Sequence, residues 1–233
     1  MKTDLTQTIC LGKIKGNAPA AFVDPLKPET TALVIVDMQG RAERAAKEPL
    51  RTAAANCRRL LQMARRLPIP IVHVRLGTWT RDCRELSLDK KYYTALARRR
   101  GRRVPRHIDE PDNQPLPGLE PRRGEIVQQK TSAGAFATTG MAGILHNLGV
   151  KDLVMAGQLT HGCLGMTAIE AVNWGYIVTM VDDASASPDC HEGHLAMLRL
   201  FDQFWGRVRS TDEVIAELTA RRARAPRKRR GPR

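Results

Sequence analysis

The chain has 233 residues, is 42% hydrophobic and carries a formal net charge of +14, which fits one domain with one substantial core. The charge is concentrated in two basic runs, Arg98 to Arg106 and Arg221 to Arg233, so the rest is only mildly basic. No apolar run is long enough to cross a bilayer or form a signal peptide. Five scattered cysteines indicate free thiols in a reducing cytoplasm and argue against a disulfide framework.

The first half of the chain alternates a strand pattern with a helix pattern. Prolines keep residues 1–29 an irregular arm. The pattern then predicts, in chain order, a buried strand at Thr31–Val36, a helix at Leu50–Leu67 and a second strand at Ile69–Leu76. Residues 77–124 are rich in Arg, Pro and Gly, and we interpret them as an insertion or lid with a short helix near Tyr92–Arg99.

The second half repeats the alternation. We expect strands at Glu125–Gln129, Asp152–Ala156 and Tyr176–Val181 and an edge strand at Val208–Arg209. The helices that alternate with them are expected at Gly140–Leu148, Met166–Trp174, His191–Phe204 and Thr211–Ala220. This order predicts a three-layer α/β/α sandwich with a mostly parallel central sheet and Rossmann-like topology. We expect one domain over residues 30–220 and a disordered basic tail at 221–233.

Three reactive side chains lie where predicted elements meet. Asp37 ends the first strand, Lys130 follows the third, and Cys163 stands between a strand and a helix. Catalytic groups of α/β proteins gather at the carboxyl ends of the strands. A free thiol is mostly protonated at neutral pH and needs a base or a cation to become a nucleophile. An acid, an amine and a thiol in these positions therefore predict a cysteine nucleophile with its own proton-transfer groups.

The sequence around these residues resembles the isochorismatase-like cysteine hydrolase family, which includes nicotinamidases, carbamoylsarcosine amidases and ureidoacrylate amidohydrolases. The matching segments are Val36-Asp37-Met38-Gln39, then Lys130 with Gly134-Ala135-Phe136, and finally Gly157, Thr160, Cys163, Thr167 and Ala168. The last segment is the most specific. The resemblance covers most of the chain and implies the sandwich fold, a small-molecule substrate and a homo-oligomer.

The resemblance also implies a role for each residue. Cys163 would attack the substrate and form a thioester, Asp37 would take the thiol proton and return it to the leaving amine, and Lys130 would hold Asp37 ionised. A cis peptide at Gln158–Leu159 would direct the backbone N–H groups of Leu159 and Cys163 toward the developing oxyanion.

Differences between this sequence and the family's motifs restrict the substrates and ligands that we expect. Nicotinamidases carry an Asp-x-His metal-binding stretch after the second strand, where this chain has Arg75 to Asp82, so we expect neither a metal nor a cofactor. Gly134 replaces a small hydroxyl residue, which either widens the pocket or removes a contact. The candidate substrate-binding residues are Gln39, Arg75, Trp79 and Phe136, although core packing is an alternative for the two aromatic side chains.

Two other functions stay open. An isochorismatase-type vinyl-ether hydrolase would use Asp37 without covalent catalysis, but isochorismatases commonly replace the cysteine, so the retained Cys163 favours cleavage of an amide or carbamoyl C–N bond. The basic runs allow phosphate-backbone binding to nucleic acid, which we do not favour because the tail lacks interleaved aromatic residues. His161, His191 and His194 lack an obvious third metal ligand and are interpreted as structural.

Overall fold

The computed structural model describes residues 25–101, 104 and 107–220. Most of the predicted N-terminal arm, four residues of the basic run from Arg98 to Arg106 and the C-terminal tail lie outside these residues. Within them, six strands form an all-parallel sheet in the order β3-β2-β1-β4-β5-β6, which confirms the predicted α/β sandwich. The strands are β1 (Thr31–Val36), β2 (Ile71–Leu76), β3 (Ile126–Lys130), β4 (Asp152–Gln158), β5 (Ile177–Ala186) and β6 (Arg207–Arg209).

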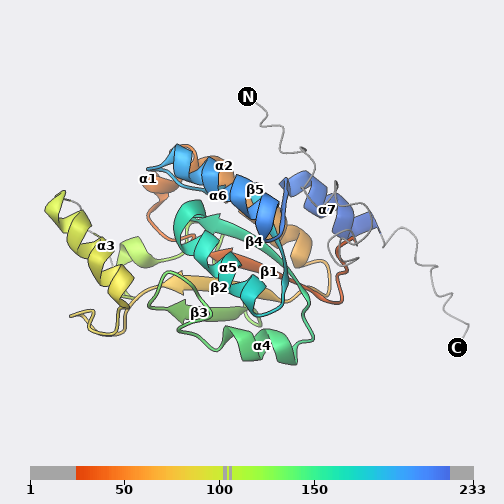
Figure 1. Cartoon of the computed structure of the whole chain (residues 1–233), viewed down its shortest axis with the longest axis horizontal. Helices are drawn as coiled ribbons and strands as arrows, with labels where there is room; N and C mark the ends of the chain where they lie inside the picture. The colour runs from red at the N-terminus through yellow and green to blue at the C-terminus, as the bar shows by residue number, and fades with distance from the viewer. Residues whose placement is uncertain (1–24, 102–103, 105–106, 221–233) are drawn as a thin grey trace, which may run out of the picture.

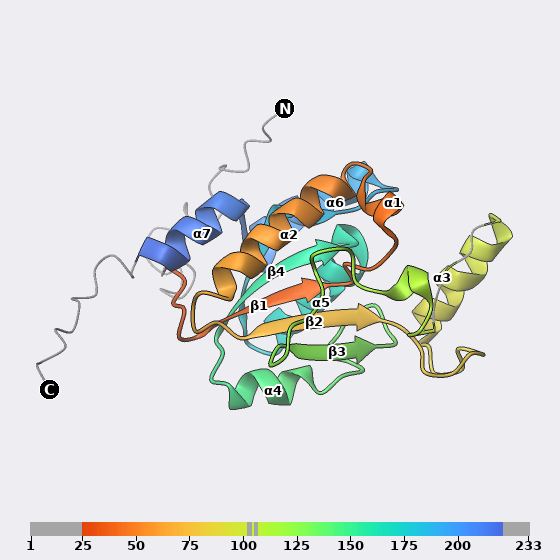
Figure 2. The same ribbon diagram turned by 180° about the vertical axis from the view of Figure 1, so that it is seen from behind.

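Helices cover both faces of the sheet. They are α1 (Ala42–Ala45), α2 (Leu50–Ala64), α3 (Leu88–Arg99), α4 (Met141–Asn147), α5 (Gly165–Asn173), α6 (His191–Phe204) and α7 (Thr211–Ala220). Figure 2 shows α2 in front of the sheet, and Figure 1 shows α5 in front of the opposite face. Within the described residues, no helix has the length and apolarity needed to cross a membrane.

The core has two halves separated by the sheet. On one face α2 and α7 pack against alternate side chains of β1, β4 and β5, and on the other α4, α5 and α6 pack against the remaining ones. Both faces of the central strands are therefore buried, which explains their continuous apolar sequences. Leu60 and Leu61 of α2 are fully buried, and each such side chain stabilises the fold by roughly 1.5–3 kcal/mol.

The strand order reverses between β1 and β4, and ligands of α/β proteins commonly bind at the carboxyl ends of the strands at such a reversal. Val36 pairs with Gly157 at the ends of these strands. Gly157 has a φ of 130°, and a Cβ atom there would lie 2.0 Å from the carbonyl oxygen of Val36. Only glycine allows the two backbones to approach so closely at this point.

Several boundaries differ from the sequence-based prediction for identifiable reasons. Strand β5 continues to Ala186 instead of ending at Val181, because a register shift lets it pair again with the end of β4. Helix α3 begins at Leu88, one turn before the predicted start, with Ser87 as its N-cap residue. Lys130 is the last residue of β3 and pairs with Leu76. Helix α1 and a 3-10 turn at Pro111–Asn113 were not predicted.

Candidate active site

Asp37 and Lys130 form a buried ion pair at the carboxyl edge of the sheet. Lys130 Nζ lies 2.9 Å from Asp37 Oδ2, and the Lys130 side chain is completely buried. The ammonium also donates to the carbonyl oxygens of Ser132, at 3.1 Å, and Ala133, at 2.9 Å. Its three hydrogens thus have three acceptors. Burial alone would lower the pKa of Lys130, but the charges of Asp37 and Cys163 raise it above its usual value, so the amine stays protonated.

The second carboxylate oxygen of Asp37 has no such partner. Oδ1 is buried and accepts no hydrogen bond from the part of the chain that the structure describes. Asp37 has a φ of 51°, in the left-handed region that few non-glycine residues adopt. Such outliers cluster at functional sites. Oδ1 is therefore an acceptor held in place by the ion pair of Oδ2 and open to a proton from a reacting group.

Cys163 lies in the turn that joins β4 to α5. Residues Thr160–Leu164 form a π-helical turn with non-helical dihedral angles at Gly162, and the Cys163 side chain is buried. Burial raises the pKa of the Cys163 thiol and the charge of Asp37 raises it further, while the charges of Lys130 and Lys90 lower it. The thiol is thus protonated before reaction, and a base close to it has a proton to remove.

Lys90, which the sequence analysis missed, also reaches Cys163. It belongs to the first turn of α3, in the Arg-rich insertion, and its Nζ donates to Cys163 Sγ at 3.2 Å. The arrowheads of β1, β2 and β3 in Figure 2 point toward the end of the molecule at which α3 lies. No local pattern separates Lys90 from Lys91, so only the tertiary structure identifies it.

The peptide bond between Gln158 and Leu159 is cis, as the family resemblance implied. The Gln158 side chain donates to the backbone oxygen of Asp37 at 2.7 Å and accepts from Arg44 at 3.3 Å. It therefore ties the end of β4 to the residue that carries the free carboxylate oxygen. The oxyanion role of the Leu159 and Cys163 amides stays a prediction.

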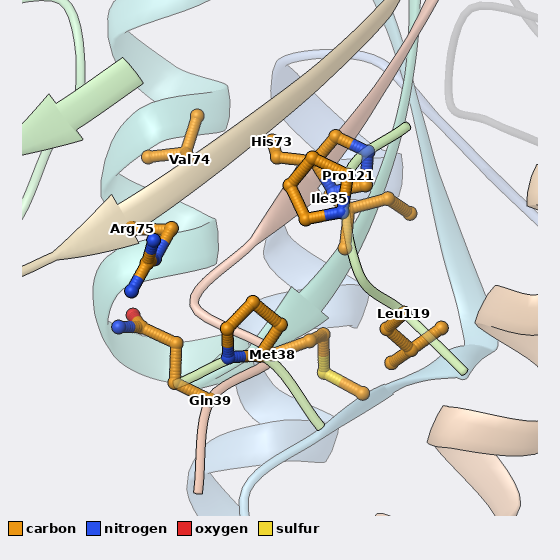
Figure 3. Close-up of a pocket in the computed structure, with 9 residues that line it drawn as sticks. Ile35, Met38, Gln39, His73, Val74, Arg75, Leu119 and Pro121 are labelled. Carbon is orange, nitrogen blue, oxygen red and sulfur yellow. The ribbon is translucent and has the colours of Figure 1, made fainter. Parts of the chain in front are cut away.

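Gln39 and Arg75, predicted to bind substrate, point toward each other beside a small pocket (Figure 3). The pocket has a volume of about 10 Å³, which is room for one water molecule at most. The Gln39 side chain bonds both backbone groups of Leu76 as well as Asn113. Arg75 donates to Asn113 and Gln114, and burial lowers its pKa. Both side chains thus hold the insertion against the end of β2, and a contact with substrate stays a prediction.

The two aromatic candidates have different surroundings. Phe136 is buried and packs against Trp174 and Tyr176, with ring centroids 6.4 and 5.9 Å apart. This is the core packing that the sequence left open as an alternative. Trp79 is 59% exposed, and its backbone N–H donates to Glu85.

A larger cavity lies between α1, α3 and the segment after β5. Its volume is about 640 Å³, within the range of small-molecule sites. The lining residues are Gly40, Arg41, Glu43, Arg44, Lys47, Glu48, Leu50, Tyr93, Ala97, Val104, Asp112, Pro188 and Asp189. Tyr93 and Ala97 follow Lys90 by three and seven positions and share its helix face. Arg44 contacts Gln158, so the cavity adjoins the carboxyl edge of the sheet.

Two of the three histidines considered above contact hydroxyl groups within the fold. His161 Nδ1 lies 2.8 Å from Ser187 Oγ, and His194 Nδ1 lies 2.8 Å from Thr160 Oγ1. Among the residues that the structure describes, no group of three or more His, Cys, Asp or Glu side chains is arranged to hold a metal ion.

Comparisons with known proteins agree on one family. A sequence model of the isochorismatase domain matches residues 31–213. The secreted isochorismatase effector Isc1 of Verticillium dahliae is 29% identical over 163 residues, 69% of this chain and 75% of its own length. The ureidoacrylate amidohydrolase RutB of Rhizobium rhizogenes is 25% identical over 213 residues, 83% and 85% of the two chains. The maleamate amidohydrolase of Pseudomonas putida is 31% identical over 102 residues, which cover only 43% of this chain and 46% of its own length.

Two solved structures extend the comparison to the fold. A cysteine hydrolase from Pseudomonas syringae pv. phaseolicola superposes with a TM-score of 0.71 at 22% identity, covering 84% of this chain and 96% of its own. An isochorismatase from Pseudomonas putida has a TM-score of 0.61 at 30% identity, covering 82% and 92%.

Proposed function

The chain belongs to the isochorismatase family, and we propose that it is a cysteine hydrolase that cleaves an amide or carbamoyl C–N bond of a small molecule through a thioester on Cys163. One observation carries the proposal: the thiol of Cys163 lies in a turn beside the buried Asp37–Lys130 ion pair, close enough for both charges to shift its pKa. Two of the relatives are named as amidohydrolases, of ureidoacrylate and of maleamate. These names support an amide substrate for this chain.

The acylation half of the reaction follows from the positions of these groups. Asp37 Oδ1 accepts the thiol proton, and Cys163 Sγ forms a bond to the carbonyl carbon as the carbonyl π electrons move to oxygen. Backbone N–H groups of Leu159 and Cys163 stabilise this oxyanion. The intermediate then collapses, the C–N bond breaks, and the departing nitrogen takes the proton from Asp37. Lys130 keeps its proton throughout and favours the ionised state of Asp37.

Deacylation uses the same groups in reverse. Asp37 removes a proton from water, the water oxygen attacks the thioester carbonyl, and the C–S bond breaks as Sγ recovers the proton. The products are a carboxylic or carbamic acid and an amine or ammonia.

Alkylation kinetics test the first step without knowledge of the substrate. We expect brief, substoichiometric iodoacetamide to label Cys163 first, as resolved by peptide mass spectrometry. Asp37→Ala should slow this labelling, because the loss of the base outweighs the loss of a charge that raises the thiol pKa. Cys57 is an internal reference, because burial raises its pKa to about 12 and its thiol donates to the carbonyl oxygen of Ala184. Equal and slow labelling at Cys163 and the partly exposed Cys83 would contradict an activated thiol.

Turnover of a panel of small amides and ureido acids tests the chemistry. Cys163→Ala should abolish both hydrolysis and a covalent acyl adduct in the intact mass, whereas Cys83→Ser, a matched thiol loss outside the site, should preserve both. One observation favours vinyl-ether hydrolysis as the second candidate, since one relative and one structural neighbour are named isochorismatases. Isochorismate turnover that survives Cys163→Ala would support that activity instead.

A further inference from the structure

We infer that Lys90 is a second catalytic cation, which the insertion helix α3 delivers to the nucleophile and which stabilises Cys163 as a thiolate when Asp37 removes its proton. The inference rests on the proposed cysteine chemistry and adds a residue to it. It also gives the insertion a function, because α3 must lie against the site for Lys90 to reach the sulfur.

Among the contacts of the Lys90 ammonium, the one with the sulfur of Cys163 is the shortest. Its Nζ lies 3.2 Å from Cys163 Sγ, and its side chain is only 11% exposed. The other partners are weaker, since the half-exposed Asp89 carboxylate lies 3.9 Å away and the Tyr93 ring centroid 5.8 Å away. A buried ammonium is costly unless it is compensated. The adjacent Lys91 is exposed, so the burial of Lys90 is specific to its position on the helix.

Helix α3 is fixed at the end that carries Lys90. Ser87, its N-cap residue, donates to the backbone oxygen of Thr131 through both its amide and its hydroxyl, each at 3.1 Å. Thr131 directly follows Lys130, so the first turn of α3 is tied to the strand end that bears the ion pair. The hydroxyl of Thr94 donates to the backbone oxygen of Lys90 one turn later. These hydrogen bonds fix the backbone at Lys90, so the fold itself brings the ammonium close to the sulfur.

The ion pair leaves a role for a second cation. Lys130 directs its three hydrogens to Asp37 Oδ2 and to the carbonyl oxygens of Ser132 and Ala133. Lys130 also interacts with the sulfur through its charge and a hydrogen bond, and Lys90 adds a separate donor at 3.2 Å. Hydrogen bonds to an ionised partner are roughly twice as strong as neutral ones. The contact between Lys90 and Cys163 therefore strengthens when the thiol loses its proton.

The electron and proton balance of the step is simple. The thiol proton moves to Asp37 Oδ1, the negative charge stays on Cys163 Sγ, and the Lys90 N–H group remains on nitrogen. When the C–S bond forms, the charge passes to the carbonyl oxygen and the hydrogen bond from Lys90 weakens. Lys90 thus acts on the thiolate without gaining or losing a proton.

The test is the pH dependence of Cys163 alkylation in the full-length protein. The variants are Lys90→Met, Lys90→Arg and the matched control Lys91→Met, which removes the same charge from the exposed neighbour. We expect Lys90→Met to slow iodoacetamide labelling of Cys163 at neutral pH on the order of tenfold, equivalent to an upward shift of about one unit in the midpoint of the profile. Lys90→Arg should keep most of the wild-type rate, and Lys91→Met should match wild type.

The outcomes separate this inference from the proposed function. A wild-type profile for Lys90→Met would overturn the role of Lys90 and leave the cysteine mechanism intact. Failure of wild-type Cys163 to label selectively would overturn both. Labelling of the buried Cys57 reports unfolding, and if Lys90→Met shows it, Lys90→Gln takes its place. A midpoint that moves equally for Lys90→Met and Lys91→Met would indicate a general charge effect and would also overturn the inference.

Discussion

The carboxylate of Glu170 occupies the space in which Gly134 would carry a side chain. A Cβ atom at Gly134 would lie 2.1 Å from Glu170 Cδ, while Glu170 Oε2 accepts from the backbone N–H of Phe136 at 2.8 Å. The glycine that stands where the family has a small hydroxyl residue therefore leaves no empty space at this point. It admits a carboxylate from α5, which fixes the segment after Lys130.

Gly134→Ala should destabilise the protein by about 1–3 kcal/mol, because the methyl group displaces Glu170 and leaves the Phe136 N–H without its acceptor. Glu170→Ala should cost a similar amount. In the Glu170→Ala background, Gly134→Ala should be nearly neutral, since the clashing carboxylate is gone. Urea unfolding of the four proteins gives this double-mutant cycle, and additive losses would contradict the displacement mechanism.

Gln39 should matter for stability whether or not it contacts substrate. It is buried and bonds Asn113 and both backbone groups of Leu76. Gln39→Leu keeps the volume but removes these bonds, so we expect a loss of about 2–4 kcal/mol in unfolding free energy. The matched change Gln62→Leu, on an exposed face of α2, should stay within about 0.5 kcal/mol of wild type. A Gln39→Leu protein as stable as the Gln62→Leu control would contradict a structural role.

Much of the site could be predicted from sequence for a physical reason. Parallel strands bring their carboxyl ends to one edge of the sheet, so Asp37, Lys130 and Cys163 had to converge once their strands were identified. Lys90 could not be found in this way. Its position depends on how a long insertion folds back, and no sequence pattern distinguishes it from the adjacent, exposed Lys91.

Phe136 illustrates the opposite difficulty. The sequence allowed either a wall of the substrate site or core packing for Phe136, and the ring packs against Trp174 and Tyr176. A contact between Phe136 and substrate stays a prediction. Sequence proximity to a reactive residue does not give the direction of a side chain beyond the end of a strand. The extended end of β5 was missed for a related reason, since its pairing resumes only after a register shift.

Glu125 should make the fold sensitive to acid. Burial alone would raise its pKa, but hydrogen bonds from Arg65, the Arg122 backbone and His73 lower it to about 2. A carboxyl whose pKa is lower in the folded state stabilises it above the unfolded pKa and loses this contribution as pH falls toward the folded value. The ionised Glu125 is thus expected to stabilise the folded state at pH 7, and this contribution should be lost between about pH 4.5 and 2.

Glu125→Gln should lower the unfolding free energy at pH 7 by about 1–2 kcal/mol after allowance for solvent screening. The difference from wild type should shrink as the pH of the urea titration is lowered through that window. Glu29→Gln, at an exposed position, is the control and should track wild type at every pH. A Glu125→Gln difference that is constant with pH would show that the charge of Glu125 is not its source.

Asp182 should have the opposite pH dependence. Burial raises its pKa to about 6, and the charges of Asp183 and Glu213 add to this effect. A carboxyl whose pKa is higher in the folded state binds a proton more tightly there, so its contribution to stability falls as pH rises from about 4 to 6. At pH 7 the ionised Asp182 is therefore destabilising, and Asp182→Asn removes the charge while its Oδ1 can still accept from the Asp183 amide.

We expect Asp182→Asn to stabilise the protein at pH 7 by on the order of 1 kcal/mol after screening, equivalent to a rise in Tm of about 2–4 °C. At about pH 4 the two proteins should melt together, because the wild-type carboxyl is then protonated in the folded state. Asp183→Asn is the informative contrast. Asp183 Oδ1 accepts from the amide and hydroxyl of Thr211, the first residue of α7, so loss of its charge should destabilise. If Asp182→Asn lowered the Tm at pH 7 as Asp183→Asn does, the Asp182 carboxylate would be a stabilising acceptor and the sign of this prediction would be wrong.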